Sequence, residues 1–223
     1  MIKNSNRRIE KMGGRGSGSG SGGGATGGLN PGDIVSVSSL ISDRERHQEE
    51  VDDTLTVLRD VHEKYGVDVE DAQIAVLKGK GLTTMAYYDS AGNLAINQTY
   101  FNNERMTSAY DMCVESGFHP GRGSKSGMEA VVAHEMGHRL TDAAGERAGK
   151  GTWQLDSTAR DIVYNASRAA GYKNMNTFTA KISGYAKQNY AEAVAEAFAD
   201  VYCNGSRASR ESRAIVTELN KYF

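Results

Sequence analysis

The sequence predicts an α+β fold, with one domain over residues 29–223, on two observations. Several segments carry apolar residues at helical spacing, as Val51, Leu55 and Leu58 do within residues 43–65. Short runs of β-forming residues follow that segment, and a turn with a glycine joins two of them. We therefore expect a small mixed sheet packed with helices.

The expected elements follow in chain order. The first helix covers 43–65 and ends at Gly66, and a short strand covers 73–77. Strands at 83–88 and 93–97 flank the turn 89–92, which indicates a hairpin. Further helices are expected at 104–115, from Ser126 for about four turns to a stop at Gly145, at 157–170, at 190–202 and at 209–222. Ser126 and Glu129 form the pattern of a capping box at the start of the central helix.

The most informative segment is residues 134–138, which spell His-Glu-Met-Gly-His. Residues four apart lie on the same face of a helix, so His134 and His138 can bind one metal ion. Glu135, between them, is then directed at the same place. The alternative is two unrelated histidines on an ordinary helix. With only five histidines in the chain, that spacing is rarely accidental.

A catalytic zinc site needs three protein ligands and one open position. The alanine-rich segment 190–202 places Glu192, Glu196 and Asp200 in one stripe, each four residues apart. Three carboxylates in line repel one another unless positive charge lies opposite, so a solvated acidic face is the less favoured interpretation. The ligand is either Glu192 with Glu196 behind it, or Glu196 with Asp200 behind it. Spacing alone does not separate these registers.

Over roughly residues 70–205 the chain resembles the anthrax lethal-factor-like metallopeptidases, a family that includes the Pro-Pro endopeptidases. Three pieces carry the resemblance. Residues 134–145 are similar to the family's zinc helix and the aspartate after it, and residues 192–198 to its acidic-aromatic helix. Tyr185 lies seven residues before Glu192, where the family has its active-site tyrosine.

The resemblance implies a zincin-like fold and a zinc-dependent endopeptidase acting on a protein or peptide. It implies that Glu192 is the third Zn²⁺ ligand, that Glu196 is its supporting carboxylate, and that Tyr185 stabilises the oxyanion. Glu135 is the expected general base, which takes a proton from water and delivers it to the leaving amine. The expected metal ligands are His134, His138 and Glu192, with Glu196 and Asp142 supporting them from behind.

Two departures from the family leave the substrate open. Relatives often carry bulkier aromatic residues at Ala193 and Val194, and the insert between the two motifs is longer here than in some members. By the same resemblance, Leu94 to Thr99 would pair with an extended substrate along the edge of the cleft. His119 is not expected to bind metal, because the third ligand is better assigned elsewhere.

Composition excludes several classes of protein. A net charge of −2 gives no indication of nucleic-acid binding. No run of 18 apolar residues is present, and the N-terminus has no apolar segment typical of a signal peptide, so a cytoplasmic or virion-associated protein is expected. Cys113 and Cys203 have no cysteine partner at metal-binding spacing and are expected to be free thiols.

Residues 1–28 form a separate region. A short basic head with Lys3, Arg7, Arg8 and Lys11 precedes a glycine- and serine-rich stretch at 13–28, which predicts a flexible tether. The region is either a tail without a role or an anchor to a larger assembly, such as a phage virion. The rival to an enzyme is therefore a structural or binding module of a phage or mobile element. Its metal site would then be structural, self-processing or restricted to one partner. A toxin or effector would share the enzyme's chemistry and differ in where its substrate lies.

Overall fold

The computed structural model describes residues 34–35, 46–77, 83–150 and 155–223. Over these residues the fold is mixed α and β, mostly helical with a small mixed sheet, which confirms the expected class. The basic head and tether at 1–28 lie outside the described residues. None of the described helices is long and apolar enough to cross a lipid bilayer.

The sheet has the strand order β1–β2–β4–β3. Its strands are β1 (Ile34–Val35), β2 (Asp71–Ala75), β3 (Ala86–Tyr88) and β4 (Asn93–Asn97). Strands β2 and β4 are parallel, and the two outer pairs are antiparallel. The expected hairpin is confirmed as β3 and β4, and Gly92 turns between them at a φ of 90°. Strand β2 begins two residues earlier than expected, because its pairing with β4 starts at Asp71.

The predicted role of residues 94–99 as a substrate-binding edge is wrong. Strand β4 pairs with β2 on one side and with β3 on the other, so both of its edges are occupied. Residues 98–100 leave the sheet as a 3-10 turn. Among the described strands, β3 is the edge next to the central helix α4 (Gly127–Arg147).

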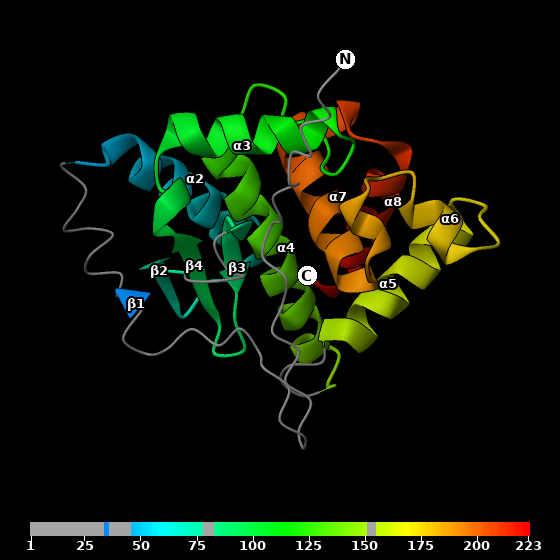
Figure 1. Cartoon of the computed structure of the whole chain (residues 1–223). Helices are drawn as coiled ribbons and strands as arrows, with labels where there is room; N and C mark the ends of the chain where they lie inside the picture. The colour runs from blue at the N-terminus through cyan, green and yellow to red at the C-terminus, as the bar shows by residue number, and fades with distance from the viewer. Residues whose placement is uncertain (1–33, 36–45, 78–82, 151–154) are drawn as a thin grey trace, which may run out of the picture.

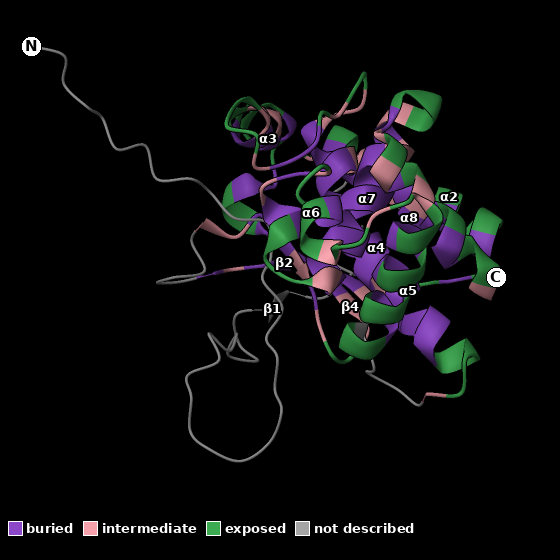
Figure 2. Ribbon diagram, turned by 90° about the vertical axis from the view of Figure 1, so that its right-hand side faces the viewer, coloured by how far each residue is buried: buried purple, intermediate pink, exposed green. Residues whose placement is uncertain are grey.

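Helix α4 runs through the middle of the molecule (Figure 1), with the sheet and α2 on one side and α5, α7 and α8 on the other. Figure 2 shows that α4 and α7 are the most deeply buried helices. The remaining helices are α2 (Gln48–Tyr65), α3 (Asn103–Glu115), α5 (Leu155–Ala169), α6 (Met175–Thr179), α7 (Tyr190–Asn204) and α8 (Arg210–Leu219).

Helix α4 begins as the sequence predicts and ends later. Ser126 and Glu129 form the capping box through both of its reciprocal hydrogen bonds. The predicted stop at Gly145 is wrong, because Gly145 is a buried residue within the helix. The helix continues to Arg147, and the glycine with positive φ is Gly149, at 69°. This adds a further half turn at the end of the helix.

The ends of helices α2 and α8 also differ from the predicted residues. Helix α2 starts at Gln48 rather than at residue 43, and it ends at Gly66 with a φ of 62°, as expected. Helix α8 begins at Arg210 with Ser209 as its N-cap, and residues 220–222 form a separate 3-10 turn after it. The short helix α6 was not anticipated. Cys113 and Cys203 are buried free thiols, as expected.

Candidate metal centre

The histidine motif lies in the buried middle of α4. His134 is 0% exposed, Glu135 1% and His138 3%. The rings of the two histidines lie 5.0 Å apart between centroids and nearly perpendicular to each other, as one helical turn places them. Both side chains face α7, the helix that packs most extensively against α4.

Helix α7 approaches α4 closely because small residues line both helices at the crossing. A Cβ atom built on Gly137 would lie only 2.6 Å from Ala195 Cα and 3.2 Å from Phe198 Cβ. Only glycine fits at this position without a shift of the α7 backbone. On α7 the crossing is at Ala195, one residue before Glu196 and three after Glu192. The approach of the two helices therefore sets the distance of both carboxylates from the histidines.

The carboxylate of Glu192 lies close to the imidazoles of both His134 and His138. Its Oε2 atom lies 3.2 Å from His134 Nε2 and 3.3 Å from His138 Nε2. One ligand atom from each residue falls within 4.8 Å of the other two. Ligands at about 2.0–2.1 Å in a tetrahedral site lie about 3.3–3.4 Å apart, which matches both distances. These residues could hold a metal ion.

The polar atoms of this cluster also fit a cation. His134 Nε2, His138 Nε2 and Glu192 Oε2 are buried, and within the described part of the chain none makes a hydrogen bond of good geometry. Buried polar atoms are nearly always satisfied, so three that converge without hydrogen bonds require an explanation. A shared metal ion would satisfy all three.

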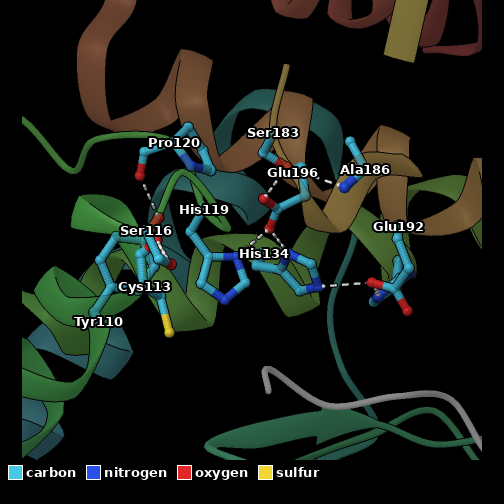
Figure 3. Close-up of polar contacts among 11 residues, drawn as sticks. Tyr110, Cys113, Ser116, His119, Pro120, His134, Ser183, Ala186, Glu192 and Glu196 are labelled. Atoms are coloured by element: carbon cyan, nitrogen blue, oxygen red, sulfur yellow. Dashed lines mark hydrogen bonds and ion pairs between the residues drawn. The ribbon is translucent and has the colours of Figure 1, made fainter. Parts of the chain in front are cut away.

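Glu196 lies behind His134, on the side away from Glu192 (Figure 3). Its Oε1 is 2.8 Å from His134 Nδ1, and its Oε2 accepts a hydrogen bond from Ser183 Oγ at 2.6 Å. Burial would raise the pKa of Glu196, but His119 and His134 lower it to about 2, so the carboxylate is ionised. An ionised carboxylate only accepts, so His134 Nδ1 must donate, and the lone pair for a metal is on Nε2 once that nitrogen has lost its proton.

Asp200, the third carboxylate of the acidic stripe, serves another purpose. It accepts hydrogen bonds from the Asn204 side chain at 2.9 Å and from the Ser209 backbone N–H at 2.9 Å. These contacts tie the end of α7 to the start of α8. Of the two registers that spacing left open, the geometry matches Glu192 at the cluster with Glu196 behind it.

The charges at the centre shift the protonation of its members. Burial opposes the charged form of His134, but the adjacent carboxylates of Glu192 and Glu196 raise its pKa to about 10. Burial alone would raise the pKa of Glu192, yet His138 and His134 lower it to about 2. Burial raises the pKa of Glu135 to about 7, against the opposing charges of His134 and His138. Glu135 can therefore exchange protons near neutral pH.

Tyr185 completes the centre. Its ring is 1% exposed and stacks on that of His134 at 5.7 Å between centroids. Burial, followed by the charges of Glu192 and Glu135, raises the pKa of its hydroxyl well above the usual value. The hydroxyl therefore keeps its proton over the working pH range and can act as a hydrogen-bond donor.

Asp142 lies one turn beyond His138 and connects α4 to the sheet. It accepts a hydrogen bond of 3.2 Å from the Tyr88 hydroxyl, on the edge strand β3. The backbone of the same tyrosine lies beside Glu135, whose pKa it helps to lower. Asp142 thus helps to hold β3 next to the candidate centre.

Two polar residues of the centre were missed by sequence reasoning. His119 is 3% exposed, and its Nδ1 lies 3.0 Å from Glu196 Oε1, while Ser183 donates to the other oxygen. His119 was considered only as a metal ligand and set aside. Its partner is 77 residues away in sequence, and a histidine in a glycine-rich loop gives no periodic signal.

Comparisons with protein-family models, with curated proteins and with solved structures find no match to this chain.

Proposed function

We propose that this chain is a zinc-dependent endopeptidase with a zincin-like fold, of the kind that its resemblance to the lethal-factor-like metallopeptidases implies. One observation carries the proposal. The buried His134, His138 and Glu192 side chains converge within 4.8 Å, with Glu135 on the same helix and Tyr185 stacked on His134. A general base and a hydroxyl donor therefore adjoin three metal-ligating groups.

The donor set favours zinc. Two imidazoles and one carboxylate are the ligands of many catalytic zinc sites, and three protein ligands leave a fourth position for water or substrate. Magnesium and calcium prefer sites made of oxygen ligands alone. Glu196, which orients His134 from behind, is the carboxylate that commonly supports such a ligand.

Glu135 and Tyr185 have separate roles in the proposed hydrolysis of the peptide bond. When bound, zinc polarises the scissile carbonyl and lowers the pKa of water. Glu135 takes a proton from the attacking water and delivers it to the leaving amine, and its raised pKa suits both roles. Tyr185 donates a hydrogen bond to the carbonyl oxygen as negative charge develops there.

An extended substrate would pair with β3. Among the described residues, this strand has a paired neighbour on one side only and packs against α4. Tyr88 of β3 is tied to Asp142 of α4, which keeps the strand near Glu135. Main-chain hydrogen bonds to such an edge bind peptides largely without regard to sequence.

The proposal is tested by Glu135→Gln, assayed by mass spectrometry of a peptide library and by elemental analysis. We expect zinc to be retained and cleavage to fall by roughly 100-fold or more, because the general base is lost. Glu146→Gln, an exposed position on the same helix, is the matched control and should cleave like the wild type. If Glu135→Gln cleaves at the wild-type rate, this mechanism is wrong.

A further inference from the structure

His119 lies in the loop between α3 and α4 and is buried although it is polar. Its ring stacks on Tyr110 at 5.4 Å and 9°, and it meets the ring of Tyr185 edge-on at 5.4 Å. Its Nδ1 atom lies 3.0 Å from Glu196 Oε1, within hydrogen-bond distance. The ring therefore packs against two tyrosines. Figure 3 shows one of its nitrogens directed at the carboxylate of Glu196.

The loop that carries His119 is tied down on several sides. Arg122 makes two hydrogen bonds to Asp111, at 2.8 and 2.9 Å, and the Tyr110 hydroxyl donates to the backbone oxygen of Pro120 at 3.0 Å. The backbone N–H of Tyr185 donates to the oxygen of Phe118 at 2.9 Å. The position of His119 is thus fixed relative to both α3 and the segment that carries Tyr185.

Glu196 is held by three donors from three parts of the chain. His119 and His134 both approach Oε1, at 3.0 and 2.8 Å, and Ser183 donates to Oε2 at 2.6 Å. The 3.0 Å contact makes the His119 Nδ1–H the donor and the carboxylate oxygen Oε1 the acceptor of a hydrogen bond. Without His119, the carboxylate would keep one donor on each oxygen, and its rotation toward His134 would be less restricted.

We propose that His119 is a positioning residue of the metal centre. Its Nδ1–H fixes the carboxylate of Glu196, which in turn holds His134 in the tautomer and orientation that direct Nε2 toward the metal. This inference rests on the proposed function only in its requirement that the cluster binds zinc. It assigns a role to a buried histidine that neither binds the metal nor contacts the reacting atoms.

The test compares three substitutions of His119. Asparagine places an amide nitrogen close to the Nδ1 position, glutamine places it further out, and phenylalanine keeps the ring that stacks on Tyr110 but has no donor. We expect His119→Phe and His119→Gln to weaken zinc binding by about 10-fold or more, the range found for supporting residues of metal sites. We expect His119→Asn to stay within about threefold of the wild type.

Zinc affinity is measured by competition with a chelator, and folding by circular dichroism of the metal-free proteins. A packing role alone predicts the opposite order, with His119→Phe like the wild type and His119→Asn impaired, and that order would overturn the proposal. If His119→Phe does not fold, the contrast between asparagine and glutamine decides in the same way.

A double-mutant cycle sharpens the result. In a Glu196→Gln background, His119→Phe should cause little further loss of zinc affinity, because its effect passes through the Glu196 carboxylate. Fully additive losses would overturn the proposal. A wild-type protein that binds zinc but cleaves no peptide would refute the peptidase function and leave this inference standing. A wild-type protein that binds no zinc would refute both.

Discussion

Gly137 lies where α4 crosses α7, and we expect its replacement by alanine to destabilise the protein, which is the reverse of the usual effect in a helix. In an ordinary helix, replacing a glycine by alanine stabilises the protein by roughly 0.5–1 kcal/mol. At Gly137 the added methyl carbon would lie 2.6 Å from Ala195 Cα, whereas carbon atoms pack at about 3.5–4.0 Å. Helix α7 must therefore move by about 1 Å.

That shift is large for a metal site. Glu192 and Glu196 lie on α7 on either side of Ala195, so both carboxylates move with the helix. Metal–ligand distances tolerate only about 0.2 Å. Overpacking costs about 1–3 kcal/mol, which outweighs the helical gain. We expect Gly137→Ala to be destabilised by about 1–2 kcal/mol and to bind zinc at least about 10-fold more weakly.

Thermal unfolding of the metal-free protein and competition with a chelator measure the two effects. Gly121→Ala is the control, since nothing lies within 4 Å of the added Cβ there and the φ angle is not positive. The control should match the wild type in both assays. If Gly137→Ala raises the melting temperature and leaves zinc affinity unchanged, the close approach of the helices does not determine the geometry of the centre.

Three further predictions concern chemistry and organisation. Tyr185→Phe should retain zinc and lower kcat by roughly 100- to 1000-fold, because a donor to the oxyanion is lost; a change confined to KM would contradict this. Metal-free His134 has a pKa raised to about 10, so it is protonated at pH 7 and must lose that proton to bind zinc. Calorimetry in buffers of different ionisation enthalpy should therefore detect release of about one proton or more, and affinity should rise with pH between 6 and 8; no proton release would contradict the assignment. Removing residues 1–28 should leave zinc content and peptide cleavage unchanged, while any binding to a larger assembly is lost; loss of cleavage would show that the tether is part of the enzyme.

The histidine motif could be placed from the sequence because helical spacing is a local property. Residues four apart face the same way whatever surrounds them, and the capping box at Ser126 fixed where α4 begins. The acidic stripe on α7 was equally visible. Choosing between its registers needed the packing of α7 on α4, which Gly137 and Ala195 determine together.

The features that were missed depend on contacts between distant segments. The edge strand was misassigned because the crossover that places β4 between β2 and β3 has no local signature. His119 and Glu196 are 77 residues apart, and only the folded loop brings them together. Gly145 resembled a stop signal, yet a glycine can continue a helix where the surrounding residues are buried.

The most direct test of the metal centre is the zinc content of the purified protein, measured by elemental mass spectrometry alongside two variants. We expect one zinc per chain in the wild type, its loss in Glu192→Gln, and its retention in Asp200→Asn, because Asp200 accepts hydrogen bonds from Asn204 and the Ser209 backbone instead. A wild type without zinc after reconstitution, or a Glu192→Gln variant that retains it fully, would contradict the proposed site.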